Sequence, residues 1–340
     1  MMLKRVYLKI ILMILFASVA LSQSTTKTGS TAAQFLKIGV GPRAVGMGSA
    51  FTATSNDLTA IYWNPAGLAG SYSYEAFFNH VNWVADISYD FAGVSAHLSG
   101  IGTIGAFVTI LQSIDGMLVR TVDNPEGSGE KFDAGAIAIG LSFARNLTEN
   151  FSIGFNVKYI REYIWNESAI GVGLDAGVLY KIPILNELRL AASISNFGSK
   201  MQLDGRDILE IKQVGEGGEG NLINSKIEMQ EWELPLLFRV GVAADIFKSE
   251  SSRLTTAIDA IHPNDHTEYV NLGAEYCWNE LISLRAGYNS LFEENTEEGL
   301  TLGVGLNYRL IESVRVLLDY AYKDFGRLNS VHYFSVGVKF

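Results

Sequence analysis

Charged residues that fall on one face of strand-like segments are the main candidates for chemistry in this sequence. In segment 300–310, apolar residues occupy the even positions, while Thr301, Asn307 and Arg309 occupy odd positions. Side chains alternate between the two faces of a strand, so this pattern sets charges opposite an apolar face. The same alternation assigns to the polar face Lys158, Asp175, Arg239, Asp245, Asp259, Glu275, Arg285, Arg309, Arg315 and Asp319. Around an interior, such groups form either ion pairs that fill it or a selectivity lining for a solute or a polypeptide segment.

Catalysis and metal binding find little support in the sequence. His262 and His266 flank Pro263 in a turn and not on a helix face, which disfavours a metal pair. Ser95 and His97 are two positions apart in a strand, an arrangement more typical of ordinary lining than of a nucleophile with its base. Gly-x-Gly patterns occur, but none lies at a strand-to-helix turn of a βαβ unit. We therefore predict no enzyme activity, no cofactor and no bound metal.

The elements that must position these charges are fourteen alternating segments. They span 72–83, 86–98, 102–114, 132–145, 151–163, 170–181, 187–197, 234–247, 253–262, 267–277, 281–289, 300–310, 313–323 and 331–340. An apolar outer face with a polar inner face is the pattern of a transmembrane β-barrel, and an even strand number is typical of bacterial barrels. The last segment ends on Phe340 and is similar to the closing strand of outer-membrane barrels. The predicted fold is therefore all-β, a 14-stranded antiparallel transmembrane β-barrel with an N-terminal glycine-rich plug segment.

Successive connections between these segments alternate between long and short. If the N-terminal segment is periplasmic, the outward connections include the long stretches 115–131, 198–233, 290–299 and 324–330. The opposite connections are short: 99–100, 146–150, the turn near 183, 248–252, 278–280 and 311–312. Long surface loops and tight periplasmic turns are typical of these barrels. Stretches 115–131 and 201–233 are either solvated loops or contact sites for a partner.

Three regions follow from the amino-terminal composition. Lys4 and Arg5 precede a short apolar run at 10–20, which predicts a secretory signal peptide over 1–22, cleaved after Ser22. Residues 23–70 are the predicted leader and plug segment, and 71–340 the barrel. Cleavage would remove three cations (Lys4, Arg5 and Lys9) and no acid, so the net charge would change from −10 to −13. Such an acidic chain is an improbable binder of nucleic acid. We expect an integral protein of the outer membrane of a Gram-negative-type bacterium.

Stretch 33–69 resembles the N-terminal signature of the PorV/PorQ family, barrels within the wider FadL-like superfamily. The matching residues are Gly46, Met47 and Gly48, then Asn56 and Asp57, then Trp63, Asn64, Pro65, Ala66 and Gly67. Their composition suits a chain folded inside a barrel mouth. Glycines allow close approach, Asn64 can cap a turn, and Pro65 fixes φ.

The resemblance implies a component of type IX protein secretion. Such a barrel binds exported cargo that carries a C-terminal sorting domain, or a surface partner, at its extracellular face. The alternative is a FadL-like channel for long-chain fatty acids or other hydrophobic small molecules, with an apolar pocket beside the plug. A soluble periplasmic β-sandwich is the third interpretation. Expected partners are outer-membrane lipid with secretion-system proteins and cargo, or, for the alternative, a hydrophobic small ligand.

Overall fold

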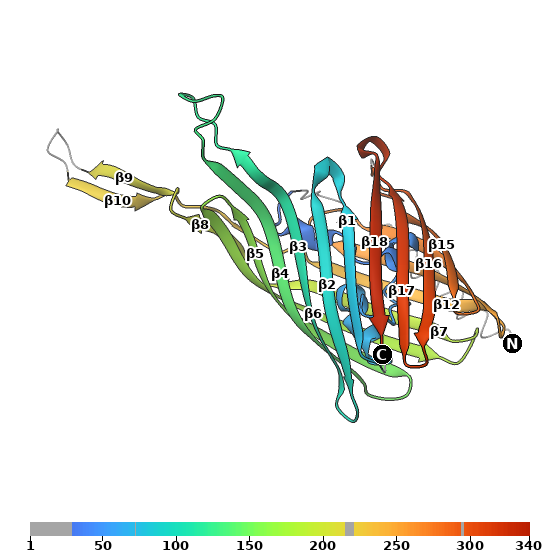
Figure 1. Cartoon of the computed structure of the whole chain (residues 1–340). Helices are drawn as coiled ribbons and strands as arrows, with labels where there is room; N and C mark the ends of the chain where they lie inside the picture. The colour runs from blue at the N-terminus through green and yellow to red at the C-terminus, as the bar shows by residue number, and fades with distance from the viewer. Residues whose placement is uncertain (1–28, 72, 215–220, 294–295) are drawn as a thin grey trace.

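The computed structural model describes residues 29–71, 73–214, 221–293 and 296–340, and the signal peptide predicted over 1–22 lies outside them. Fourteen antiparallel strands pair in chain order into a barrel (Figure 1), which confirms the predicted fold. They are β1 (Glu75–Asn82), β2 (Ser88–Leu98), β3 (Gly102–Leu118), β4 (Lys131–Asn146), β5 (Phe151–Ile164), β6 (Glu167–Ile182), β7 (Leu188–Gly198), β12 (Leu237–Lys248), β13 (Ser252–Pro263), β14 (Tyr269–Trp278), β15 (Ile282–Leu291), β16 (Leu300–Ile311), β17 (Val314–Asp324) and β18 (Ser330–Lys339). Strand β1 closes the barrel against β18, with Phe78 opposite Val336.

The alternation seen in the sequence becomes two faces of the wall. On β16, Leu302 is 47% exposed and points outward, whereas its neighbour Thr301 is fully buried against the interior. The same inside–outside pattern recurs on β5, β6 and β12. A continuous outer band of leucine, isoleucine, valine and aromatic side chains is suited to lipid and unsuited to water.

The two ends of the barrel differ in their connections. Turns at the end near the C-terminus are short, whereas the opposite end carries the long connections (Figure 1). We call these the periplasmic end and the outer end. The connection from β7 to β12, predicted as a loop, contains β8 (Met201–Gly205), β9 (Leu209–Val214), β10 (Asn221–Lys226) and β11 (Glu231–Trp232). Strand β8 extends the sheet beside β6, and the β9–β10 hairpin projects away from the barrel (Figure 1).

The N-terminal segment fills the barrel and forms the plug. It contains η1 (Gln34–Lys37), and then α2 (Pro42–Gly46), α3 (Ala60–Trp63) and η2 (Pro65–Gly70). The backbone N–H of Ala32 donates to the carbonyl of Glu233 at the outer end (2.9 Å), and Ser71 leads into β1 at the periplasmic end. The segment therefore crosses the whole lumen from the outer end to the periplasmic end. No helix in the described ranges is long and apolar enough to cross a membrane.

Glycines set how closely the plug approaches the wall. Gly48 adopts a positive φ of 63°, and a Cβ on it would overlap backbone atoms of β14 and β15. A Cβ on Gly287 of β15 would in turn overlap the backbone of Met47 and Gly48. Backbone therefore meets backbone, which only glycine permits here. The apolar side chains of Phe51, Leu58 and Leu68 are fully buried in this contact.

Candidate functional site

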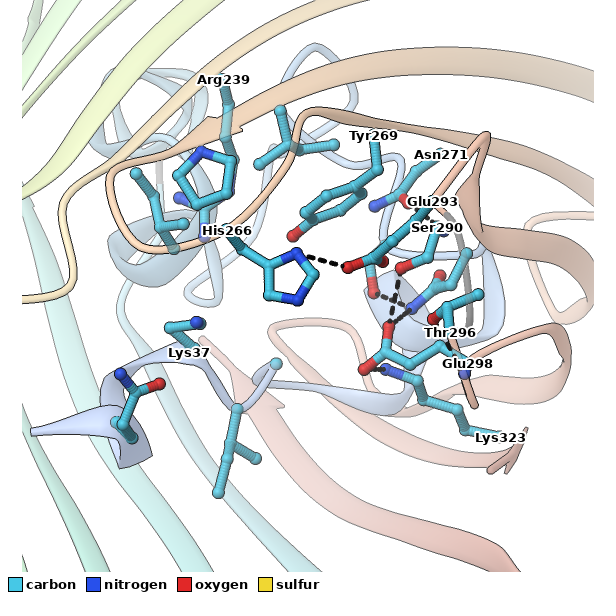
Figure 2. Close-up of a pocket in the computed structure, with 18 of the residues that line it drawn as sticks. Lys37, Arg239, His266, Tyr269, Asn271, Ser290, Glu293, Thr296, Glu298 and Lys323 are labelled. Atoms are coloured by element: carbon cyan, nitrogen blue, oxygen red, sulfur yellow. Dashed lines mark hydrogen bonds and ion pairs between the residues drawn. The ribbon is translucent and has the colours of Figure 1, made fainter. Parts of the chain in front are cut away.

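A cavity of about 480 Å³ lies at the outer end, between the plug and the wall (Figure 2). Its apolar lining comes from both sides: Phe35, Ile38, Tyr62 and Trp63 from the plug, and Trp83, Leu237, Ile261 and Tyr269 from the wall. Its polar lining comes largely from β12, the β13–β14 connection and the β15–β16 connection. A cavity of this size, with apolar walls and placed polar groups, is typical of small-molecule sites.

Arg239 is the distinctive polar group of this cavity. It lies on β12, is only 4% exposed, and donates from Nη1 to Ser195 Oγ at 3.1 Å. Its guanidinium carbon lies 5.6 Å from the ring centroids of both Tyr62 and Trp63. Among the described carboxylates, none forms an ion pair with it. Asp259 on the neighbouring strand acts on this guanidinium electrostatically without forming an ion pair, so the buried charge is only partly balanced.

The other basic side chains in the cavity already have acidic partners. His266 Nδ1 lies 2.8 Å from Glu293 Oε1, and Lys323 Nζ lies 2.7 Å from Glu298 Oε1. Figure 2 shows both acids on the far side of the cavity from Arg239. Glu298, in the β15–β16 connection, keeps 31% of its side chain exposed. Partial burial disfavours its charge, but the charge of Lys323 and the hydrogen bonds from Lys323, Asn289 and Ser290 together hold its pKa below the usual range.

Asp265, in the β13–β14 connection, holds the first part of the plug against the rim. Its carboxylate accepts from Thr31 Oγ1 (2.9 Å), Gln34 Nε2 (2.8 Å) and Lys37 Nζ (3.0 Å). Burial opposes the charge of Asp265, but the hydrogen bonds from Gln34 and Lys37 prevail and lower its pKa. These contacts place η1 as one wall of the cavity.

The ten residues of the plug motif hold the plug together and contact the wall below the cavity. Trp63 Nε1 donates to the carbonyl of Val40 (2.8 Å). Asn64 is fully buried and its side chain caps η2 by accepting from Ala66 N (3.1 Å), while donating to the carbonyls of Thr52 (2.9 Å) and Val178 (3.1 Å). The remaining residues lie in α2 and the turn after it (Gly46, Met47, Gly48), beside Arg43 (Asn56, Asp57) and in η2 (Pro65, Ala66, Gly67).

Most of the predicted lumen charges lie in ion-pair networks. Glu275 accepts from Arg43 (2.9 Å) and from Arg285 (2.7 Å), and Arg285 also reaches Asp319 (2.6 Å). Lys158 pairs with Asp175 (2.8 Å) and Asp245 with Arg189 (2.6 Å), while Asp259 accepts from the backbone of Thr52 (2.8 Å). Arg309 and Arg315 lie near the periplasmic end. Of the predicted set, only Arg239 lines the outer cavity.

Several residues that line the cavity were not predicted from the sequence as site residues. Glu293 and Glu298 lie in a stretch predicted as a surface loop, and His266 lay in a turn dismissed as a metal site. The only signal that pointed to them was the acidic character of 293–298 beside a strand end. In the described part of the chain, no group of three or more His, Cys, Asp or Glu is arranged to hold a metal ion.

Comparisons with known proteins agree with the fold. No family model and no curated protein matches this sequence. Among solved structures, it is similar to the Pseudomonas putida toluene transporter TodX, with a TM-score of 0.55, 14% identity, and coverage of 88% of this chain and 97% of that one. The two chains share the barrel fold. The Ralstonia pickettii toluene transporter TbuX is similar with a TM-score of 0.54 and 11% identity, over 88% of this chain and 97% of that one. The monoaromatic hydrocarbon channel CymD is similar with a TM-score of 0.53 and 12% identity, over 89% of this chain and 97% of that one.

Proposed function

We propose that this FadL-like barrel takes up an amphipathic small molecule across the outer membrane, and that the molecule binds first in the outer cavity through an anionic head. The observation that carries this proposal is Arg239, a buried cation without an acidic partner among the described residues, which lines an aromatic cavity. A carboxylate would supply the missing charge, and a charge-assisted bond to a guanidinium is among the strongest available.

The apolar part of the ligand has matching surroundings. Tyr62, Trp63 and Trp83 present rings to the cavity, and Ile38 and Leu237 add aliphatic surface. A volume of about 480 Å³ lies within the range of roughly 300–1,000 Å³ that is usual for small-ligand sites. The structurally similar proteins TodX, TbuX and CymD transport or conduct aromatic hydrocarbons, which supports a hydrophobic ligand. Long-chain fatty acids combine both features.

Binding to the purified full-length barrel in detergent tests this. Dodecanoate and its methyl ester are titrated by calorimetry against the natural protein and Arg239→Gln. Loss of one charge-assisted hydrogen bond costs roughly 1.5–3 kcal/mol, so Arg239→Gln should weaken dodecanoate about 10- to 100-fold and leave the ester unchanged. Arg206→Gln is the matched control, because that side chain is 72% exposed on the long connection. Equal affinities of natural protein for acid and ester would refute an anionic head.

The second candidate is a secretion component of the PorV/PorQ type. The projecting β9–β10 hairpin favours it, because Leu209, Ile211 and Leu222 are 58%, 71% and 71% exposed there. An isolated two-stranded hairpin is only marginally stable in water, so a protein partner would stabilise it. The plug motif also resembles that family.

Affinity purification from mild-detergent outer membranes, followed by mass spectrometry, separates the two candidates. Surface proteins that share one C-terminal domain should copurify with the natural barrel and not with a variant in which 209–226 is replaced by a glycine–serine linker. A barrel recovered with fatty acid alone would exclude the secretion role.

A further inference from the structure

A second cavity, of about 230 Å³, lies at the periplasmic end and shares no lining residue with the outer cavity. Its walls come from the plug around Arg43 and Asp57 and from the inner faces of β13 to β18 and β1. Most charges there are paired within the network of Arg43, Arg285, Asp57, Glu275 and Asp319. This network holds two cations and three carboxylates.

Three further cations lie at this end of the barrel. Arg309 on β16 lies directly opposite Arg315 on β17, and Arg315 lies directly opposite Lys339 on β18. Like charges at directly opposed positions repel and destabilise a sheet. Lys339 has an acidic partner, Glu75, at 2.9 Å, whereas neither Arg309 nor Arg315 forms an ion pair with a described carboxylate. The acids and bases that line the whole cavity are equal in number, so the unpaired positive charge is confined to Arg315 and to the exposed Arg309 beside the cavity.

We propose that the periplasmic mouth binds the carboxylates of an acidic protein segment through Arg309, Arg315 and Lys339. This inference is independent of the function proposed for the outer cavity. The row spans two strand spacings, about 10 Å, which exceeds the reach of one small anion. Alternate side chains of an extended peptide lie about 7 Å apart, so two or three carboxylates can contact the row together. Lipid phosphate is disfavoured because the row faces inward, while its neighbour Val316 faces outward.

Fluorescence anisotropy with labelled hexaglutamate, hexaglutamine and unlabelled inorganic phosphate tests the site on the full-length barrel in detergent. Hexaglutamate should bind at low salt and weaken as NaCl rises, because the contacts are ionic. The double variant Arg309→Gln/Arg315→Gln should lose about tenfold or more in affinity, while Arg309→Lys/Arg315→Lys keeps the charges and most of the binding. Arg120→Gln/Lys131→Gln, at the outer end, is the matched control and should bind like the natural protein.

Two further readouts keep the test decisive. Removal of two opposed like charges should leave the melting temperature unchanged or higher, so loss of binding would not reflect misfolding. Hexaglutamate that binds the glutamine double variant as tightly as the natural protein would overturn the proposal. Phosphate that displaces hexaglutamate at equal concentration would also overturn it, because the site would then be one for a single small anion.

Discussion

Replacement of Asn64 by alanine should release the plug before the barrel unfolds. The Asn64 side chain makes three hydrogen bonds in a fully buried position: it accepts from Ala66 N and donates to the carbonyls of Thr52 and Val178. The first bond caps η2, the second joins two parts of the plug, and the third joins the plug to β6. Alanine removes all three and offers no replacement.

The magnitude follows from what is left behind. A buried group that loses its only partner costs roughly 1–3 kcal/mol, and a carbonyl that retains another bond costs less. Three such losses sum to about 3–6 kcal/mol for docking of the plug. The fourteen-strand wall keeps its own ladder of backbone hydrogen bonds, so the plug should loosen at a temperature where the wall is still closed.

Tryptic cleavage after Lys37 and Arg43, followed by mass spectrometry during a temperature ramp, measures this release. The Asn64→Ala variant should be cut at least several degrees below the natural protein. Asn64→Asp keeps the acceptor for Ala66 N but sets a second oxygen against the carbonyls of Thr52 and Val178, so its cleavage temperature should be no higher than that of Asn64→Ala. Asn56→Ala is the control, because that amide makes a single bond to Arg43 near the surface. Equal cleavage temperatures for the Asn64→Ala and Asn56→Ala variants would refute the reasoning.

Three other perturbations probe the same plug. Gly177→Val should also expose it to trypsin, because the new Cβ would overlap Asn64 Oδ1; cleavage unchanged from natural protein would contradict this. Glu275→Gln should lower the free energy of unfolding by about 3 kcal/mol or more, because it leaves the guanidinium groups of Arg43 and Arg285 short of negative charge. Denaturant titration followed by tryptophan fluorescence measures this, and an unfolding midpoint within error of the natural one would count against it. Asp265 has a lowered pKa, so its hold on η1 is complete above about pH 4, the usual pKa, and is lost only as the pH falls through the lower folded value. Cleavage after Lys37 should therefore be constant from pH 7 to 5, rise only at stronger acidity, and be rapid at every pH in Asp265→Asn.

The sequence predicted the barrel well because its signal is local. The apolar–polar alternation of a strand lies within its own sequence, so the fourteen segments and the inward face of each could be predicted without knowing which strands are neighbours. Strand β3 continues to Leu118, beyond the predicted end at 114, because register shifts between Gln112 and Met117 interrupt the alternation there. The β9–β10 hairpin was missed because its strands lack a buried face and therefore carry no clear apolar–polar pattern.

The site was harder to predict because it depends on which strands meet. The alternation places Arg239 inward, as it does Arg285, but only the fold shows that Arg285 has two acidic partners while Arg239 has a hydroxyl and two rings. The opposition of Arg309 and Arg315 likewise depends on the register of β16 against β17, which a single strand does not encode.

The placement of the two cavities limits how the barrel can work. They share no lining residue and the plug lies between them, so a ligand in the outer cavity reaches the periplasm only if the plug or the wall moves. The plug is held unevenly. Its outer part depends on contacts to Asp265, where Lys37 is 28% exposed, and such pairs contribute little. Its inner part depends on Asn64 and Glu275, which are buried and costly to disturb. The outer part is therefore the portion that ligand binding can displace at low cost.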